Sequence, residues 1–393
     1  MHVRHGTADT LAPPLWERPT RPREKDFGQD PFIVIWEVTQ ACRLACVHCR
    51  ATAQPDRHPL ELTTAEGRAL IDQIACFDDP LFVLTGGDPL ERPDLFDLIA
   101  YAAGRGLRVT LTPSATPRLT PTAIRAARAA GARRMALSLD GSDAARHDAF
   151  RQVDGSFAIT MTGLAAARER GLPVQINTTV CRRTIHDLPA IGELVRTQGV
   201  ALWAAFFLVP TGRGKSEDLL SARETEEALG WLCDFSRTAP FPVKTTAATH
   251  YRRVVLEQMR RERETDAAAK VVAFARHRAN FASPDGIPRA RRGVNDGNGF
   301  CFISHTGDVY PSGFLPVTAG NVRRTSVVDL YRHSPLFQRL RDPDALKGRC
   351  GVCEYRRVCG GSRARAFAVT GDLMAEDPSC AYLPRARRSE QHP

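Results

Sequence analysis

The sequence has no uninterrupted apolar run of the roughly 18 residues that a membrane-spanning helix needs. Its first 30 residues are polar and proline-rich, and they lack the apolar core of a secretory signal. Its cysteines number 11, an odd count that argues against a disulfide framework in a chain without such a signal. No aromatic-rich nucleic-acid motif accompanies its basic residues. These absences predict a cytoplasmic protein that does not span a membrane, and they argue against nucleic acid as its partner.

Basic side chains outnumber acidic ones, with 54 Lys and Arg against 44 Asp and Glu. This excess favours an anionic partner: nucleic acid, anionic lipid or a substrate that carries carboxylates. It is densest in residues 250–292, which hold eleven basic and five acidic side chains. Two interpretations of that segment stay open: a solvated helix and loop of mixed charge, or a rim that attracts an anionic substrate.

From residue 31 to about residue 214, short apolar runs alternate with helical patterns. We predict strands over residues 32–38, 81–84, 108–111, 134–139, 174–180 and 202–209, and helices over residues 63–77, 93–103, 120–130, 156–170 and 186–198. Six such strand–helix units predict an α/β fold whose parallel sheet curves into a partial (β/α)6 barrel. In barrels of this type the loops that follow the strands build the active site.

The strand–helix rhythm stops after residue 214. Residues 217–237 and 251–278 have helical patterns, whereas residues 279–298 have the Gly, Pro, Asn and Arg content of a loop. We therefore predict a flexible leader, a barrel core, a helical and basic connecting region, a second cysteine-bearing module and a polar tail, at residues 1–30, 31–214, 215–298, 299–383 and 384–393.

Three cysteines, Cys42, Cys46 and Cys49, form a C-x3-C-x2-C triplet directly after the first predicted strand. Three thiolates on one loop are able to hold three irons of a [4Fe–4S] cluster, whereas clusters that only carry electrons take four. The missing ligand leaves one iron with an open position, where a substrate or cofactor binds. The triplet therefore predicts a cluster that takes part in chemistry.

Polar and glycine-rich positions follow several of the other strands. Two glycines after the second strand would let a ligand approach the backbone closely. An aspartate after the fourth strand is able to accept hydrogen bonds from ribose hydroxyls, and the basic loop of residues 210–214 is able to hold an anion. Each signal alone is also typical of an ordinary turn or strand end. The candidates are Gly86, Gly87, Asp88, Ser138, Asp140 and Asn177.

Four cysteines lie near the end of the second module, at Cys350, Cys353, Cys359 and Cys380. Their spacing is compatible with a zinc site and with a second [4Fe–4S] cluster. Other cysteines stand singly among apolar or helical residues, and we interpret them as small buried hydrophobes; these are Cys76, Cys181 and Cys233.

The triplet together with Gly86-Gly87-Asp88-Pro89 resembles the radical SAM superfamily, over residues 31–214. The second motif is similar to the family's GGEP motif with Asp in place of Glu, and His48 stands where an aromatic residue is most common. The resemblance implies that S-adenosylmethionine (SAM) binds the open iron. It implies further that a reduced cluster cleaves SAM to a 5′-deoxyadenosyl radical, which abstracts hydrogen from the substrate. An electron donor such as flavodoxin or ferredoxin is implied as well.

The same resemblance implies roles for the residues that follow the strands. The methionyl amino group of SAM would contact Gly86, Gly87 and Asp88. The ribose and carboxylate of SAM would face the later strands, at Ser138, Asp140 and Asn177.

The cysteines of residues 350–380 resemble the SPASM or Twitch-like extension of radical SAM enzymes. This resemblance implies one auxiliary [4Fe–4S] cluster with four cysteine ligands, because Ser312 and Arg363 stand where ligands of a further cluster would fall. Cys301 is then a non-ligand. Residues 350–372 are similar to the branch that acts on tetrapyrrole propionates in haem and haem d1 biosynthesis.

Three functions follow as hypotheses. The first is hydrogen abstraction from a tetrapyrrole propionate, with Arg213, Arg252 and Arg253 pairing with substrate carboxylates and with His250 and Tyr251 as substrate contacts or structural residues. The second is a maturase that modifies a ribosomally made peptide. The third is an iron–sulfur scaffold or a nucleic-acid binder, for which the basic excess is the only argument.

Overall fold

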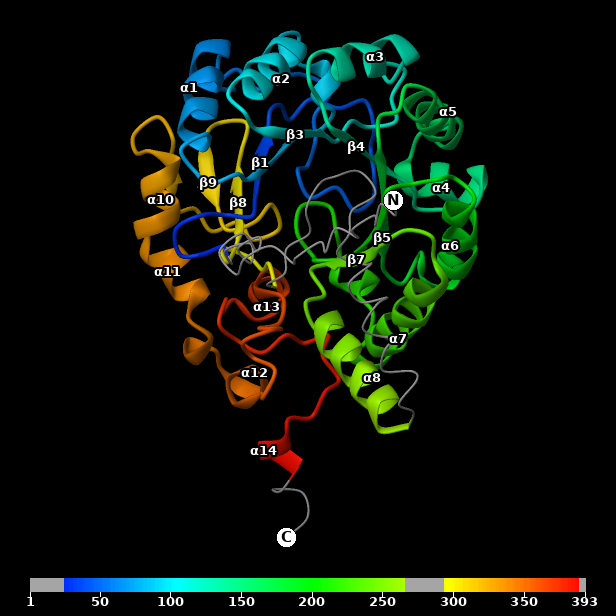
Figure 1. Cartoon of the computed structure of the whole chain (residues 1–393), viewed down its shortest axis with the longest axis vertical. Helices are drawn as coiled ribbons and strands as arrows, with labels where there is room; N and C mark the ends of the chain where they lie inside the picture. The colour runs from blue at the N-terminus through cyan, green and yellow to red at the C-terminus, as the bar shows by residue number, and fades with distance from the viewer. Residues whose placement is uncertain (1–24, 266–292, 389–393) are drawn as a thin grey trace, which may run out of the picture.

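The structure is a computed structural model that describes residues 25–265 and 293–388 (Figure 1). The strands in these residues join one sheet, in the order β10-β9-β8-β1-β2-β3-β4-β5-β6-β7. Their bounds are β1 Ile33–Glu37, β2 Leu81–Thr85, β3 Arg108–Leu111, β4 Arg134–Ser138, β5 Val174–Val180, β6 Leu202–Phe207, β7 Val243–Thr246, β8 Phe300–Ile303, β9 Asp308–Tyr310 and β10 Gly320–Asn321.

Every strand pair from β8 through β1 to β7 is parallel, whereas β9 and β10 add antiparallel strands beyond β8. The order ends at β7 on one side and at β10 on the other, so the barrel formed by the described residues is open. The carboxyl ends of its parallel strands therefore gather at one rim, where the predicted site residues follow the strands.

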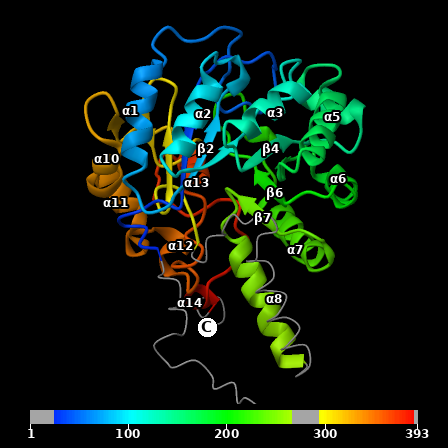
Figure 2. The ribbon, with the colours of Figure 1, turned by 45° about the horizontal axis from the view of Figure 1, so that its top comes forward.

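Helices follow the strands and surround the sheet (Figures 1 and 2). In the barrel region they are α1 Thr64–Ile74, α2 Leu95–Gly104, α3 Pro121–Ala129, α4 Ala144–Arg151, α5 Ser156–Glu169, α6 Leu188–Arg196, α7 Ala222–Thr238 and α8 Tyr251–Thr265. The later helices are α10 Val327–His333, α11 Pro335–Arg341, α12 Gly348–Val352, α13 Arg363–Thr370 and α14 Arg385–Arg388. In the part of the chain that is described, no helix combines the length and apolar character needed to cross a membrane.

Local sequence signals explain where several helices begin. The Thr63 hydroxyl and the Glu66 carboxylate form a reciprocal capping box at the start of α1. Ser221 and Glu224 do the same for α7. These caps satisfy backbone N–H groups that the first turn of a helix leaves without partners.

The core lies between the sheet and its helices. Along β1, Val34 and Trp36 are fully buried in a cluster with residues of α1 and α2, whereas Ile33 and Ile35 pack with Leu81 in a smaller cluster. This alternation follows from the two-residue period of a strand. Gly67 of α1 lies so close to Trp36 that an added Cβ atom would stand 2.7 Å from the indole ring.

The predicted α/β fold with a partial parallel barrel is confirmed, and the six predicted strands are present with ends shifted by at most two residues. The strand β7, the helix α4 and the strands and helices after residue 298, among them β8, were not predicted. β7 reads Val-Lys-Thr-Thr and β8 reads Phe-Cys-Phe-Ile, runs too short to predict a strand by periodicity. The sheet thus continues past residues 214 and 298, and the division of the chain into domains stays a prediction.

The end of the predicted flexible leader is ordered by packing. Phe27 is buried, and its carbonyl oxygen accepts a 2.8 Å hydrogen bond from the Tyr331 hydroxyl. The prediction of a loose segment is therefore wrong for residues 25–30, because an aromatic side chain binds them to the C-terminal module. Residues 1–24 and the end of the helix predicted over 251–278 lie outside the described residues.

Candidate active site and a second cysteine pocket

The triplet loop leaves the carboxyl end of β1, as predicted. Cys42 and Cys46 are buried, and they share a small apolar cluster with Leu44, Ala53 and the partly buried Cys49. Among the residues described, no three His, Cys, Asp or Glu side chains converge closely enough for a single metal ion. Cys42, Cys46 and Cys49 nevertheless belong to one packed cluster on this loop.

Hydrogen-bond donors are directed at the triplet sulfurs. The Leu44 N–H donates to Cys42 Sγ at 3.4 Å. The Cys42 thiol itself donates to the Ser114 hydroxyl oxygen at 3.7 Å. A guanidinium nitrogen of Arg151 lies 3.6 Å from Cys46 Sγ. Burial raises the pKa of the Cys42 thiol to about 11, so the thiolate that a cluster requires depends on iron itself. Donors around the sulfurs fit anionic thiolate ligands.

The Gly-Gly loop after β2 packs directly on the triplet loop. The Gly87 N–H donates to Thr39 O at 2.9 Å, and the Asp88 N–H donates to Ala41 O at 2.6 Å. A Cβ atom at Gly87 would stand 2.5 Å from Gln40 O and closer still to Ala41 O. Only glycine fits this approach, so the two motifs that the sequence separates form one surface.

Asp88 is fully buried beneath this surface. Its carboxylate accepts hydrogen bonds from the Thr116 hydroxyl at 2.7 Å, from Leu90 N at 3.1 Å and from Ser114 N at 3.3 Å. Burial raises the pKa of Asp88 to about 6, although these hydrogen bonds oppose the rise. Both carboxylate oxygens are used within the protein, so Asp88 is built to hold the shape of the loop.

Asp140, after β4, is the centre of a buried network that the sequence analysis did not foresee. Its carboxylate accepts the Thr179 N–H at 2.6 Å and forms an ion pair with Arg151 of α4. Burial alone would raise the pKa of Asp140, but the Arg151 guanidinium holds it below its usual range. Because Arg151 also reaches Cys46, the network links the end of β4 to the triplet loop. The helix that carries Arg151 was not predicted, and only its N-capping Asp143 would have signalled it.

Ser138, the last residue of β4, and Asn177, in the middle of β5, lie side by side because they are register partners. Both are partly exposed, and the Asn177 side-chain oxygen accepts a 2.6 Å hydrogen bond from Gln175. The structure thus brings the predicted residues of β4 and β5 side by side, while Asp140 is turned into the protein.

His48 occupies the motif position at which an aromatic residue was expected. Its ring stacks on Phe150 of α4 with centroids 4.4 Å apart. Burial lowers the pKa of His48 to about 3, which keeps the imidazole neutral. A neutral planar ring serves the packing role of an aromatic side chain here.

The loop after β6 closes on the triplet from the other side. The Arg213 Nε donates to Cys46 O at 2.9 Å, and Gly212 adopts a φ of +59° with its backbone against Cys49 O. Arg213 therefore holds the triplet loop in place, whereas the sequence suggested it for substrate carboxylates.

A second network without a sequence signal lies at the end of β1. The Glu37 carboxylate forms a 2.8 Å ion pair with Arg50 and a 2.8 Å hydrogen bond with His305 Nδ1. Arg50 also stacks over Phe302 of β8, with its guanidinium carbon 4.4 Å from the ring centroid. Burial would raise the pKa of Glu37, but Arg50 and His305 lower it overall. The network ties the triplet loop to the C-terminal module.

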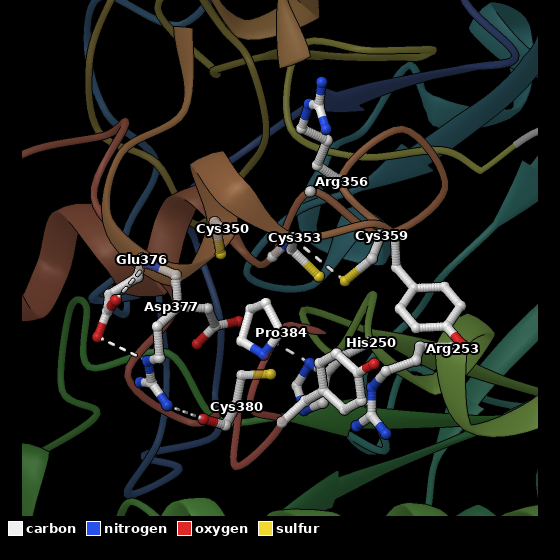
Figure 3. Close-up of a pocket in the computed structure, with 15 residues that line it drawn as sticks. His250, Arg253, Cys350, Cys353, Arg356, Cys359, Glu376, Asp377, Cys380 and Pro384 are labelled. Atoms are coloured by element: carbon white, nitrogen blue, oxygen red, sulfur yellow. Dashed lines mark hydrogen bonds and ion pairs between the residues drawn. The ribbon is translucent and has the colours of Figure 1, made fainter. Parts of the chain in front are cut away.

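The four predicted cysteines of the C-terminal module line one pocket, shown in Figure 3 and formed by Cys350, Cys353, Cys359 and Cys380. Zinc would need four sulfurs about 2.3 Å from a common centre. Within the described residues no such convergence on one ion exists.

Donors surround these sulfurs too. The Gly361 N–H donates to Cys359 Sγ at 3.4 Å, and the Thr249 hydroxyl lies 3.6 Å from the same sulfur. Arg363, at the position considered for a further cysteine, is buried and directs a guanidinium nitrogen toward Cys350 Sγ at 3.9 Å. A cation thus stands where a further ligand would have been.

The remaining cysteines are placed as follows. Cys301 is fully buried within β8, and burial raises its thiol pKa to about 12; its role as a non-ligand stays a prediction. Cys181 and Cys233 are buried as predicted. The prediction for Cys76 is wrong, because this residue is exposed just after the end of α1.

Two arginines predicted to pair with substrate carboxylates are engaged elsewhere. Arg252 donates to the carbonyl oxygen of Val358 at 3.0 Å. Arg253 is buried and donates to Glu226 at 2.8 Å and to Glu257 at 2.9 Å. This part of the prediction is wrong, because both guanidiniums are used to hold α8 against its neighbours.

An open parallel barrel with a three-cysteine loop and a Gly-Gly loop at its rim defines the class of radical SAM enzymes. The family model described as "Radical SAM superfamily" matches residues 36–195. The chain is 43% identical to the AdoMet-dependent heme synthase of Nitratidesulfovibrio vulgaris, over 90% of this chain and 93% of that protein. It is 32% identical to the pre-heme d1 synthase of Dinoroseobacter shibae, over 94% and 90% of the two chains. The chain therefore belongs to the radical SAM superfamily and is an enzyme of that family.

Solved structures agree on the fold. The crystal structure of Streptococcus suis SuiB bound to precursor peptide SuiA superposes with a TM-score of 0.67, covering 90% of this chain and 76% of SuiB at 14% identity. Identity this low supports the fold and nothing further. Members of the radical SAM family use a [4Fe–4S] cluster together with SAM.

Proposed function

We propose that this enzyme abstracts a hydrogen atom from a propionate side chain of a tetrapyrrole, in the formation of haem or of a haem d1-type cofactor. One observation carries the proposal: the chain matches an AdoMet-dependent heme synthase at 43% identity over 90% of its length. The 32% identity with a pre-heme d1 synthase supports the same substrate class. The basic excess of the chain suits a substrate with several carboxylates.

We assign the SAM-binding [4Fe–4S] cluster to Cys42, Cys46 and Cys49. When bound, the cluster and SAM together supply the 5′-deoxyadenosyl radical that removes the hydrogen atom. The protein's task is to hold this site rigidly and to exclude water from it. Burial of two of the three cysteines and the donation from Arg213 to Cys46 O support that task.

We assign the SAM contacts to the rim residues in two groups. The backbone of Gly86 and Gly87 would bind the methionyl amino group, and Asp88 would hold that backbone from below. Ser138 and Asn177, as partly exposed neighbours, would face the ribose and carboxylate. Asp140 would act through Arg151, whose guanidinium places positive charge beside Cys46.

We assign one auxiliary [4Fe–4S] cluster to Cys350, Cys353, Cys359 and Cys380. Four thiolates leave no iron open, so this cluster would transfer electrons or support the structure. The pocket that all four cysteines line supports this assignment. The reductant would be a small electron-transfer protein such as flavodoxin or ferredoxin.

The experiment is anaerobic reconstitution of the full chain, followed by iron analysis and assay for 5′-deoxyadenosine with dithionite. Two loaded [4Fe–4S] clusters give about eight irons. The variant with Ala at Cys42, Cys46 and Cys49 should retain about four irons and make no 5′-deoxyadenosine. The variant with Ala at all four C-terminal cysteines should also retain about four and still cleave SAM. SAM cleavage by the first variant would refute the site assignment.

Substrate class is tested with the wild-type enzyme. Iron–coproporphyrin and sirohaem-type tetrapyrroles are incubated with SAM and reductant, and the products are analysed by mass spectrometry. Loss of carbon dioxide or of a whole propionate side chain from either compound supports the proposal. If neither changes while a candidate precursor peptide is modified, the peptide maturase hypothesis replaces it.

A further inference from the structure

The imidazole of His250 forms part of the wall of the C-terminal cysteine pocket. Its side chain is fully buried at 0% exposure and lines the pocket together with Cys350, Cys353, Cys359 and Cys380. Figure 3 draws three of the cysteines along one side of the pocket, with Cys380 and His250 on the other. Neither ring nitrogen has a hydrogen-bond partner among the described residues. His250 is thus a buried polar group that lines the cysteine pocket and forms no hydrogen bond with the described residues.

The acidic group paired with the ring is Asp377, whose Oδ2 lies 3.9 Å from His250 Nδ1. This separation is too long for a hydrogen bond. Asp377 is also fully committed, since it accepts the Ser362 N–H at 2.8 Å and the Ser379 N–H at 3.1 Å and pairs with Arg365 at 3.3 Å. The Asp377 carboxylate is therefore fixed by these partners and does not accept a hydrogen bond from His250.

An N–H left without a partner in the interior costs about 1–3 kcal/mol, and native proteins seldom leave one so. An imidazole carries at least one N–H in either protonation state. The pocket that the ring faces is lined by four sulfurs, which accept hydrogen bonds once they are thiolates. We therefore expect the hydrogen-bond acceptor for the His250 N–H to belong to the group that the four cysteines hold.

We propose that His250 donates a hydrogen bond to a sulfur of the group held by these four cysteines and thereby raises its reduction potential. The proposal rests on the auxiliary [4Fe–4S] cluster assigned above. Hydrogen bonds to the sulfurs of a cluster are one of the protein's means of setting its potential, because they stabilise the more negative, reduced state. His250 would act alongside Gly361 and Arg363, which already direct N–H groups at Cys359 and Cys350.

His250 is a positioning and tuning residue in this scheme, because the irons keep their four cysteine ligands. A different role, in which a nitrogen of His250 replaces a cysteine as ligand to iron, is the competing outcome of the test. The two roles differ in the strength of the magnetic coupling between the nitrogen and the cluster.

The experiment uses the full chain with Ala at Cys42, Cys46 and Cys49, so that only the C-terminal cluster gives a signal. After anaerobic reconstitution, about four irons per chain should be present. Absence of iron here would refute the auxiliary cluster itself, and with it the proposed function of this pocket, before His250 is tested.

The reduction potential is then measured by EPR-monitored titration for His250→Leu, which removes the donor, and for His250→Gln, which keeps one. His250→Leu should shift the one-electron reduction equilibrium by about tenfold toward the oxidised form, or about 59 mV. His250→Gln should shift it by less than half as much. Tyr251→Phe is the matched control, since Tyr251 is the buried neighbour in sequence but does not line the pocket; its potential should be unchanged.

A second measurement requires no variant at His250. Labelling the same protein with ¹⁵N-histidine and recording pulsed EPR of the reduced cluster should reveal a weak nitrogen coupling that changes with the isotope. Absence of any histidine coupling, or an unchanged potential in His250→Leu, would overturn the proposal. A coupling as strong as that of iron-bound nitrogen would overturn it in favour of direct ligation.

Discussion

Replacing Arg151 with methionine should destabilise the protein severely, because it leaves the Asp140 carboxylate buried and unpaired. The side chains are 11% and 0% exposed, and they form an ion pair. Removing one partner of a buried pair costs about 3–5 kcal/mol. At about 2.1 cal/mol/K per residue, a chain of 393 residues has an unfolding entropy of about 0.8 kcal/mol/K. The midpoint of thermal unfolding should therefore fall by about 4–6 °C.

The assay is anaerobic thermal unfolding of the reconstituted enzyme, followed by circular dichroism. Arg146→Met on the same helix is the matched control, because the Arg146 side chain is 60% exposed and pairs with the exposed Asp143, while the Asp187 carboxylate lies 3.7 Å away. Its midpoint should fall by less than about 1 °C. The double variant Asp140→Asn with Arg151→Met removes the unpaired charge and should recover at least half of the loss.

The pH dependence has a defined sign. Arg151 holds the pKa of Asp140 below its usual value despite burial. The pair therefore stabilises the fold above the unfolded pKa of about 3.9, and this stability is lost as pH falls through the lower folded pKa. In Arg151→Met, burial acts unopposed and raises the pKa of Asp140. As pH falls, Asp140 therefore takes up a proton at a higher pH in the variant than in wild type, and the cost of its unpaired buried charge is removed. The difference in the free energy of unfolding between wild type and variant should be largest near neutral pH and should decrease toward acidic pH.

Two results would refute this reasoning. The first is a midpoint for Arg151→Met within about 1 °C of wild type, less than a third of the expected loss. The second is a double variant no more stable than the single one. Either would mean that Asp140 finds another partner or reaches water once the guanidinium is gone.

Two further predictions concern packing and access. Gly87→Ala should abolish 5′-deoxyadenosine formation and lower stability by about 1–3 kcal/mol, since its Cβ atom would collide with backbone oxygens of the triplet loop. The control Gly230→Ala lies in open space within α7; it should stabilise the helix by about 1 kcal/mol and leave activity intact. Thermal unfolding and SAM-cleavage assays compare the two variants, and equal behaviour would contradict the close approach of Gly87 to the triplet loop. In the reconstituted enzyme, maleimide should label the exposed Cys76 and spare Cys301, whose thiol pKa is about 12, as peptide mass spectrometry would show. Label on Cys301 before unfolding would mean that β8 opens to solvent.

The sequence alone determined those features that depend on local order along the chain. The barrel strands were predictable because β-rich runs recur between helical patterns, and α1 because Thr63 and Glu66 cap it. The triplet was recognisable because its three cysteines sit on one loop. Short strands such as β7 were not predictable, since four residues are too few to show the two-residue hydrophobic periodicity of a strand.

Only the tertiary structure decided which residues support the site. Arg151 reaches Cys46 across 105 positions of sequence, and Arg50 approaches Gly313 across 263. No local sequence pattern predicts such contacts, because the contacting residues come together only when the sheet has folded. The same holds for Asp88 and Asp140. Their carboxylates accept hydrogen bonds from residues far along the chain, Thr116 in a loop and Thr179 in β5. Ligand cysteines are visible in the order of the chain, whereas the donors and charges that tune them appear only once it is folded.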